Sequence, residues 1–288
     1  MKKITTTILT CCLAGTLFAQ SYSEKILREI AFEQQSIANV LYLANINGSI
    51  HVEAYDGQKI IVEAEKKVRA KTNERMERSK HELSLGVLDR YDTIIVFIKG
   101  PCGTLNYKED QRGKGYNWNN CEYDYEFKFD FTLKVPKDLN LYLSTINEGD
   151  VEVNGVLGSL NVNNVNGAIT LKQVSGLAKV HTINGDVTME YQNLPKEPST
   201  YYTLNGDINA LFPKGLKADM TFKSFNGDFY TNIKQLEYKS ATVEKKSMSK
   251  SGGLEYKVDS RYAISVGGGG VTLDFETFNG DVTIKEKQ

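Results

Sequence analysis

Proline, cysteine, tryptophan and histidine are all scarce in this chain of 288 residues, which contains five, four, one and three of them, respectively. Scarce proline suits a sheet-rich protein, because proline cannot donate a backbone hydrogen bond to a neighbouring strand. The isolated histidines do not have the spacing of a zinc site. The sequence also lacks a nucleophile elbow, a phosphate-binding loop and a dinucleotide fingerprint. We therefore expect no metal, no cofactor and no enzymatic activity.

The N-terminus has the pattern of a secretory signal peptide over residues 1–19. Lys2 and Lys3 supply a basic start, an apolar stretch follows at residues 4–18, and Ala19 is a small residue suited to cleavage. No later segment approaches the length of about 18 apolar residues that a membrane-spanning helix needs. We therefore expect an exported chain with no membrane span once the signal peptide is removed. The formal net charge of -1 gives no general attraction for nucleic acid, so none is expected as a partner.

Of the four cysteines, Cys11 and Cys12 lie within the expected signal peptide, where lipid attachment at either of them stays open. Cys102 and Cys121 are 19 positions apart in the rest of the chain. Export implies an oxidising compartment, which favours a disulfide between these two residues. Closing a loop of this size stabilises a fold by about 3 kcal/mol. Two unrelated free thiols are the alternative.

Residues 100–124 interrupt the pattern of strands and form a cysteine-bounded loop that is rich in aromatic residues. Exposed aromatic side chains can stack on sugar rings or anchor a protein partner. They can equally cap the open end of a stack of strands. The candidate contact residues are Tyr107, Tyr116, Trp118 and Tyr123.

One short pattern recurs at seven places in the chain. It consists of Thr, Ser or Asn, then an apolar residue, Asn and Gly, and in most copies an Asp followed by another apolar residue. Between Gly149 and Gly227, successive copies are separated by 18 to 21 residues. The turn residues of the seven copies are Asn47, Gly48, Asn147, Gly149, Asn166, Gly167, Asn184, Gly185, Asn205, Gly206, Asn226, Gly227, Asn279 and Gly280.

Apolar and polar residues alternate after each copy, as at Val151 and Val153, which is typical of a strand with one buried face. Asn and Gly tolerate a positive φ and mark the turns. One rung of short strands cannot bury its own apolar face, whereas stacked rungs can. We therefore predict an all-β, single-domain β-solenoid with rungs of about 18–21 residues. Its apolar residues should form an interior ladder, and its Thr and Asn positions should stack along the exposed outside. An antiparallel β-sandwich or meander is the alternative.

The domain is expected to span residues 20–288. Residues 72–82 are rich in Glu, Arg and Lys and are the best helix candidate, with Thr72 or Asn73 as the N-cap. Residues 24–43 fit either a strand or a short helix, and a strand is favoured from about Ser36.

Five of the corners carry an Asp, and paired carboxylates can catalyse the hydrolysis of sugars. Each Asp has the same place in its own copy, whereas a catalytic pair would stand out from the repeat. A calcium ladder would need a denser glycine pattern with a period of about nine residues. A structural turn is therefore predicted for Asp150, Asp186, Asp207, Asp228 and Asp281.

In these corners the chain resembles the "putative adhesin" β-strand-repeat family, which is common in exported proteins of Bacteroidetes-type bacteria and has no known function. The likeness is strongest at residues 45–52 and 279–284, and it runs over about 40–70 and 130–288. The end of the signal peptide, Phe18-Ala19-Gln20, is also similar to that of such proteins. The resemblance implies a β-solenoid protein of the cell envelope and carries over no catalytic residues.

The sequence thus predicts an exported, non-enzymatic β-solenoid protein of the cell envelope. Its role would be adhesin-like binding or scaffolding, with a glycan or another envelope protein as the ligand. A component of envelope stress or assembly that binds another envelope protein is one alternative, and a carbohydrate-active enzyme on a solenoid is another. Strand-like sequence continues almost to Gln288, so we expect no surface-sorting domain and slightly favour the periplasm over the cell surface. The oligomeric state stays open.

Overall fold

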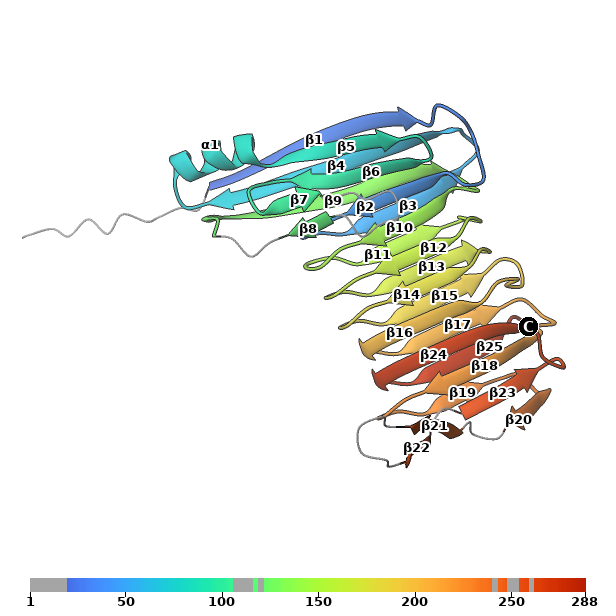
Figure 1. Cartoon of the computed structure of the whole chain (residues 1–288). Coiled ribbons are helices and arrows are strands. Elements are labelled where there is room, and N and C mark those ends of the chain that lie inside the picture. The colour runs from blue at the N-terminus through green and yellow to red at the C-terminus, as the bar shows by residue number, and fades with distance from the viewer. Residues whose placement is uncertain (1–19, 106–115, 119–121, 240–242, 248–253, 259–261) are drawn as a thin grey trace, which may run out of the picture.

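The structure is a computed structural model that describes residues 20–105, 116–118, 122–239, 243–247, 254–258 and 262–288. Two long sheets run side by side through the molecule (Figure 1). The first sheet has ten strands in the order β1 (Gln20–Ala31), β4 (Lys59–Ala70), β9 (Tyr125–Pro136), β3 (Ile50–Tyr55), β11 (Val151–Asn154), β13 (Ile169–Val174), β15 (Val187–Tyr191), β17 (Ile208–Phe212), β25 (Val282–Glu286) and β19 (Phe229–Thr231).

The second sheet has eleven strands. Their order is β20 (Leu236–Lys239), β23 (Tyr262–Val266), β18 (Ala218–Lys223), β24 (Val271–Asn279), β16 (Ser199–Asn205), β14 (Ala178–His181), β12 (Leu160–Asn163), β10 (Asn140–Ser144), β2 (Val40–Ala44), β6 (Thr93–Lys99) and β5 (Ser84–Arg90). Two hairpins complete the strands: β7 (Gly103–Leu105) with β8 (Tyr116–Trp118), and β21 (Val243–Ser247) with β22 (Leu254–Val258).

From β10 to β17, successive strands alternate between the two sheets, so that each consecutive pair forms one rung. From β10 to β15, every strand pairs in parallel with the strand two places later, as β11 does with β13 and β15 with β17. The register keeps equivalent apolar residues side by side, for example Val151 beside Ile169 and Val187 beside Ile208. The predicted stack of short strands is therefore confirmed as two long, largely parallel sheets of a solenoid-like fold.

The last rung of the chain does not lie at the end of the stack. Its strands, β24 and β25, are inserted between the rungs β16–β17 and β18–β19, and they pair in parallel with both neighbours. After β19 the chain thus passes through β20 to β23 and returns one rung earlier in the stack (Figure 1). The order of the repeats in the sequence is therefore not their order in space.

The two ends of the stack are built by antiparallel pairing. At one end β1 pairs with β4, β4 with β9, and β5 with β6. At the other end β23 pairs with β18 and β20. The antiparallel arrangement that the sequence left as an alternative is thus found at the ends of the stack, while its centre is parallel.

Inward-facing side chains of both sheets form one continuous core. Alternate residues are buried, as in β15, where Val187 and Met189 are buried and Thr188 is exposed. The predicted interior ladder of apolar residues is confirmed for the strands, whereas the apolar residue before the corner Asn is buried at Ile46 but exposed at Phe225 and Phe278. Phe225 and Phe278 hold that place in two neighbouring rungs, and their rings stack on each other outside the core, 72% and 44% exposed.

The predicted helix is α1 (Asn73–Glu82), and Thr72 is its N-cap, whose hydroxyl accepts a hydrogen bond from the backbone N–H of Arg75 at 3.3 Å. The ambiguous stretch 24–43 contains two strands, β1 up to Ala31 and β2 from Val40, and no helix. Within the described residues, no helix combines the length and the apolar character needed to cross a membrane.

Candidate functional site

The Asn residues of the seven corners form one continuous ladder of side-chain hydrogen bonds. Each Nδ2 donates to the Oδ1 of the next Asn, over distances of 2.7 to 3.2 Å, and all six bonds point the same way. In space the ladder runs through Asn226, Asn279, Asn205, Asn184, Asn166, Asn147 and Asn47. It ends where Asn47 Nδ2 donates to the backbone carbonyl of Phe127 at 3.1 Å.

Four of the seven corners carry a Thr, and all four are buried, so the prediction of exposed Thr positions is wrong: they are Thr145, Thr182, Thr203 and Thr277. The Thr203 hydroxyl donates to the carbonyl of Gly185 at 2.8 Å, and the Thr277 hydroxyl donates to the carbonyl of Gly206 at 3.0 Å. Each acceptor belongs to the neighbouring rung. The hydroxyl is turned inward because a carbonyl that is removed from water needs a donor.

The glycines of the corners are required by the close approach of the rungs. Gly206 has a φ of 154°, and a Cβ placed on it would lie 2.3 Å from the carbonyl oxygen of Gly185. Backbone atoms cannot move away as the end of a flexible side chain can. Each corner therefore excludes any residue with a side chain at this position.

The corner aspartates are acceptors for the backbone of the adjacent rung. Asp186 Oδ1 accepts from the N–H of Asp207, and Asp207 Oδ1 accepts from the N–H of Asp281, both at 2.8 Å. In the same way, Asp281 Oδ1 accepts from the N–H of Asp228. This geometry gives the carboxylates a structural task at the turn.

The cysteine-bounded loop is described only in part. Tyr107 and Cys121 lie outside the described residues, and Tyr116 and Trp118 lie on β8, which pairs with β7. Cys102 is buried. Its predicted disulfide with Cys121 therefore stays a prediction. The fourth aromatic candidate, Tyr123, is 36% exposed, and its ring lies 5.5 Å from that of Tyr125 and 5.6 Å from that of Phe127, between centroids.

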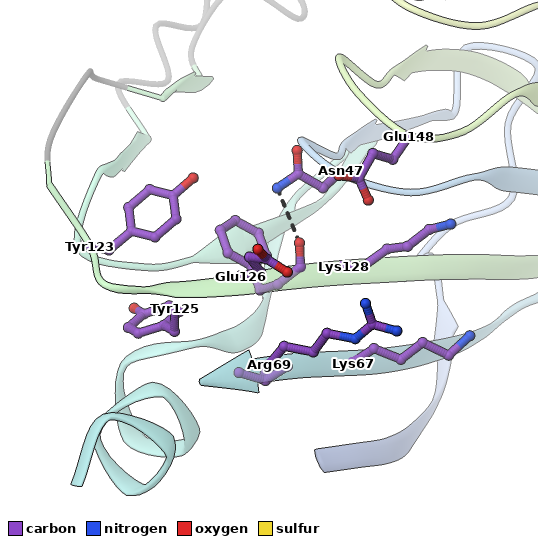
Figure 2. A pocket seen from close by; sticks show the side chains of 10 residues that line it. Asn47, Lys67, Arg69, Tyr123, Tyr125, Glu126, Lys128 and Glu148 are labelled. Atoms are coloured by element: carbon purple, nitrogen blue, oxygen red, sulfur yellow. Dashed lines mark hydrogen bonds between the residues drawn. The ribbon is translucent and has the colours of Figure 1, made fainter. Parts of the chain in front are cut away.

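Tyr123 lines a surface pocket of about 420 Å³ at the end of the Asn ladder. Figure 2 shows how three parts of the chain meet there: β4, β9 with the residues just before it, and the corners that carry Asn47 and Glu148. The complete lining consists of Asn47, Lys67, Val68, Arg69, Tyr123, Tyr125, Glu126, Phe127, Lys128 and Glu148. This pocket is the candidate functional site.

Two of the three cations in the pocket are held by carboxylates. Lys67 Nζ lies 2.9 Å from Glu65 and 3.2 Å from Asp130, and Lys128 Nζ lies 3.3 Å from Asp130. The contacts with Glu65 and Asp130 raise the pKa of Lys67. Burial by itself would raise the pKa of Asp130, but hydrogen bonds from Ser49 and Lys67 outweigh it and hold that pKa below its usual value. Lys67 and Lys128 are thus committed to Asp130.

Arg69, Glu126 and Glu148 are available for a ligand. All three side chains are exposed, and none of them makes an ion pair within the described part of the chain. Arg69 faces Glu126 across the antiparallel pair β4–β9, so a donor and an acceptor lie next to each other at the pocket wall.

Glu148 is an insertion in the corner pattern, because it lies between Asn147 and Gly149. Its φ is 59°, in the left-handed region, which costs a residue with a side chain roughly 1–2 kcal/mol. The insertion carries its side chain to the pocket. The extra residue between Asn and Gly is visible in the sequence, and it could have marked Glu148 as a candidate site residue.

Sequence reasoning identified one pocket residue as a ligand contact, Tyr123, and placed Asn47 at a structural turn. It missed Lys67, Arg69 and Lys128, because strand residues with outward-facing charges look the same wherever they lie. Among the described residues, no group of three or more His, Cys, Asp and Glu side chains has an arrangement that could hold a metal ion.

The model of a protein family described as Toastrack DUF4097 matches residues 140–285, which is half of the chain. The chain belongs to this toastrack family. The resemblance inferred from the corner residues is thereby confirmed. Of the residues that line the pocket, Glu148 lies in the matched range and the others precede it.

Solved structures from several bacteria are similar to this toastrack chain. One is a "putative cell adhesion protein" from Clostridium sporogenes ATCC 15579, with 12% identity and a TM-score of 0.44 over 92% of this chain and 100% of that one. Another is a "putative adhesin" from Bacteroides fragilis NCTC 9343, with 10% identity and a TM-score of 0.32 over 92% of this chain and 97% of that one. A search of curated proteins finds no match.

Proposed function

We propose that this toastrack protein is an exported, non-enzymatic binding protein of the cell envelope that holds a saccharide in the pocket beside Tyr123. The observation that carries the proposal is the combination of a half-exposed tyrosine ring with Arg69, Glu126 and Glu148, which have no ion pair among the described residues, around one cavity. The proposal gives an adhesin-like role a specific place on the molecule.

The chemistry of the pocket fits a sugar. An aromatic ring can pack against the apolar face of a pyranose. Carboxylates accept hydrogen bonds from hydroxyl groups, and a guanidinium donates them in a fixed geometry. A cavity of about 420 Å³ lies within the size range of sites for small ligands, which is roughly 300–1,000 Å³. The free charges of the pocket are one positive and two negative, which favours a neutral saccharide over an acidic one.

A binding role is favoured over a carbohydrate-active enzyme because the corner aspartates and Asp130 already serve as structural hydrogen-bond acceptors. The corner aspartates accept hydrogen bonds from the next rung, and Asp130 is tied to Ser49 and Lys67. A glycosidase would need two carboxyl groups with different environments on either side of the scissile bond. Release of oligosaccharide from a polysaccharide panel, abolished by Glu148→Gln or Glu126→Gln, would establish the enzyme instead.

The decisive experiment is a glycan array probed with the purified chain and with two variants of Tyr123. Tyr123→Phe keeps the ring, so we expect it to retain most of the binding, whereas Tyr123→Ala should lose at least about ten-fold in affinity. Tyr238→Ala is a matched control, because Tyr238 is 79% exposed on β20, in the rungs at the far end of the stack.

Two results would contradict the proposal. One is an array on which no saccharide is bound above background. The other is binding that Tyr123→Ala and Tyr238→Ala reduce equally, because the loss would then not come from the pocket. Circular dichroism of each variant shows whether a loss of binding reflects a loss of fold.

The proposed location is the periplasm or the cell surface, with the periplasm slightly favoured. Cell fractionation combined with protease treatment of intact cells distinguishes the two. Digestion of the protein on intact cells would place it on the surface, where an adhesin must be, whereas protection would favour the alternative role of binding another component inside the envelope.

A further inference from the structure

β1 is a long strand at the edge of the first sheet. All twelve of its residues pair with β4, from Gln20 beside Ala70 to Ala31 beside Lys59. Within the described residues, no strand pairs with its other edge. Such an edge offers a row of backbone donors and acceptors to a further strand.

The two faces of β1 differ. Tyr22, Ile26 and Ile30 are partly buried and pack against the core, and Glu24 and Arg28 alternate with them on the same face. The opposite face consists of exposed residues, among them Leu27, whose side chain is 59% exposed. The inner face therefore reads Tyr, Glu, Ile, Arg, Ile, in which the acidic and basic residues are placed symmetrically about Ile26.

We infer that the edge of β1 pairs with β1 of a second copy of this chain, antiparallel and with Ile26 on the two-fold axis. In this register Glu24 lies opposite the partner's Arg28, and Arg28 lies opposite the partner's Glu24. Tyr22 lies opposite the partner's Ile30, so apolar residues meet apolar residues on the face that continues the core. Directly opposite residues on one face of an antiparallel pair are the ones that interact.

Neighbouring registers lose this complementarity. A shift by one residue places Glu24 opposite the partner's Glu29 and Lys25 opposite the partner's Arg28, and like charges directly opposite each other are destabilising. A shift in the same direction by two places Ile26 opposite the partner's Arg28 and Glu24 opposite the partner's Ile30, which sets charge against apolar surface. The charge pattern of the inner face therefore favours the register with Ile26 on the axis.

Both charged groups are exposed, although Glu24 already accepts a hydrogen bond from the Tyr22 hydroxyl at 3.3 Å. Arg28 donates to the carbonyl of Leu27 at 2.8 Å and has no ion pair with a carboxylate in the described part of the chain. The carboxylate of Glu24 is 44% exposed and lies 3.9 Å from the ammonium group of Lys66. A second copy would thus supply Arg28 with the acidic partner that it lacks in one chain.

The test is a charge exchange, followed by analytical ultracentrifugation of the full exported chain over a series of concentrations. Glu24→Arg and Arg28→Glu should each weaken the dimer by at least about ten-fold, because each places like charges opposite each other twice. The double variant E24R/R28E should restore the dimer to within about three-fold of the wild type. Glu33→Arg, an exposed change of equal charge outside the strand, is the matched control.

The double variant makes the test specific. It does not repair the contact of Glu24 with Lys66 inside one chain, since the arginine introduced by Glu24→Arg would face a lysine. Rescue can therefore come only from pairing between copies. A monomer at every concentration, single variants that dimerise as the wild type does, or a folded double variant that stays as weak as the single ones would each overturn the inference.

Discussion

Asn279 donates a side-chain hydrogen bond of 2.7 Å to Asn205, although 74 residues separate the two in the chain. Asn226 in turn donates to Asn279, also at 2.7 Å, so that the last rung sits between two earlier ones. The corner contacts are the same there as in rungs that follow each other directly. They therefore depend on the residues of the corner and not on the connection between the rungs.

The close approach of the corners predicts a large cost for a side chain at Gly206. Gly206→Ala should lower the free energy of unfolding by about 2–4 kcal/mol, because its Cβ would meet the Gly185 carbonyl. Gly215→Ala is the matched control: Gly215 also has a positive φ, 84°, but no atom lies within 4 Å of the added Cβ. The control should cost only about 1 kcal/mol of backbone strain. Equal losses in urea unfolding would show that backbone strain alone governs both positions.

The buried hydroxyl of Thr203 should contribute measurably to stability. Thr203→Val removes the donor to the Gly185 carbonyl at nearly constant volume and leaves a buried acceptor unpaired, which costs about 1–3 kcal/mol. Thr200→Val changes an exposed position on the same strand and should alter the free energy of unfolding by less than about 0.5 kcal/mol. Chemical denaturation of both variants checks the prediction, which fails if Thr203→Val is as stable as the wild type.

Asp130 should link stability to pH. Its pKa in the folded protein lies below the ordinary value of 3.8, so its ionised form stabilises the fold above that value. The contribution is lost as the pH falls through the folded pKa. Asp130→Asn should therefore be less stable than the wild type at pH 7, and the difference should shrink as the pH is lowered below 3.8. Urea unfolding at a series of pH values measures the difference in the free energy of unfolding between the two proteins. A difference that does not change with pH would contradict the linkage.

Glu148 should show opposite effects on stability and on binding. Glu148→Gly relieves the left-handed backbone and should stabilise the protein by up to about 1 kcal/mol, while it removes an acceptor from the pocket. Glu148→Gln keeps the backbone strain and removes only the charge, so it should weaken saccharide binding without a gain in stability. Thermal unfolding and titration with the saccharide identified on the array compare the two variants. If the Glu148→Gly variant is less stable than the wild type, the backbone at Glu148 is not strained as inferred.

Local patterns were sufficient where neighbouring residues determine the structure. The alternation at Val151 and Val153 predicted a half-buried strand, and Thr72 predicted the start of α1, because each signal is contained within a few residues. The same reasoning placed Thr203 on the outside. It counted a polar residue as exposed, whereas the residue is buried to serve a carbonyl that belongs to another rung.

The candidate site could be predicted only in part. Tyr123 stood out as an aromatic residue in an irregular loop, but Arg69 and Lys128 are ordinary charged residues of strands. Their meeting depends on the pairing of β4 with β9, which brings Arg69 opposite Glu126 across 56 intervening residues of the chain. No local pattern encodes that pairing.

The sequence by itself determined the rung: period-two alternation fixes which face of a strand is buried, and Asn-Gly fixes the corner. Only the tertiary structure decided the order of the rungs and the position of the pocket. All rungs carry nearly the same corner, so the contacts between any two of them are almost equally good. The choice of neighbour is therefore made by the packing of the whole core, which places β24 and β25 inside the stack and β4 beside β9.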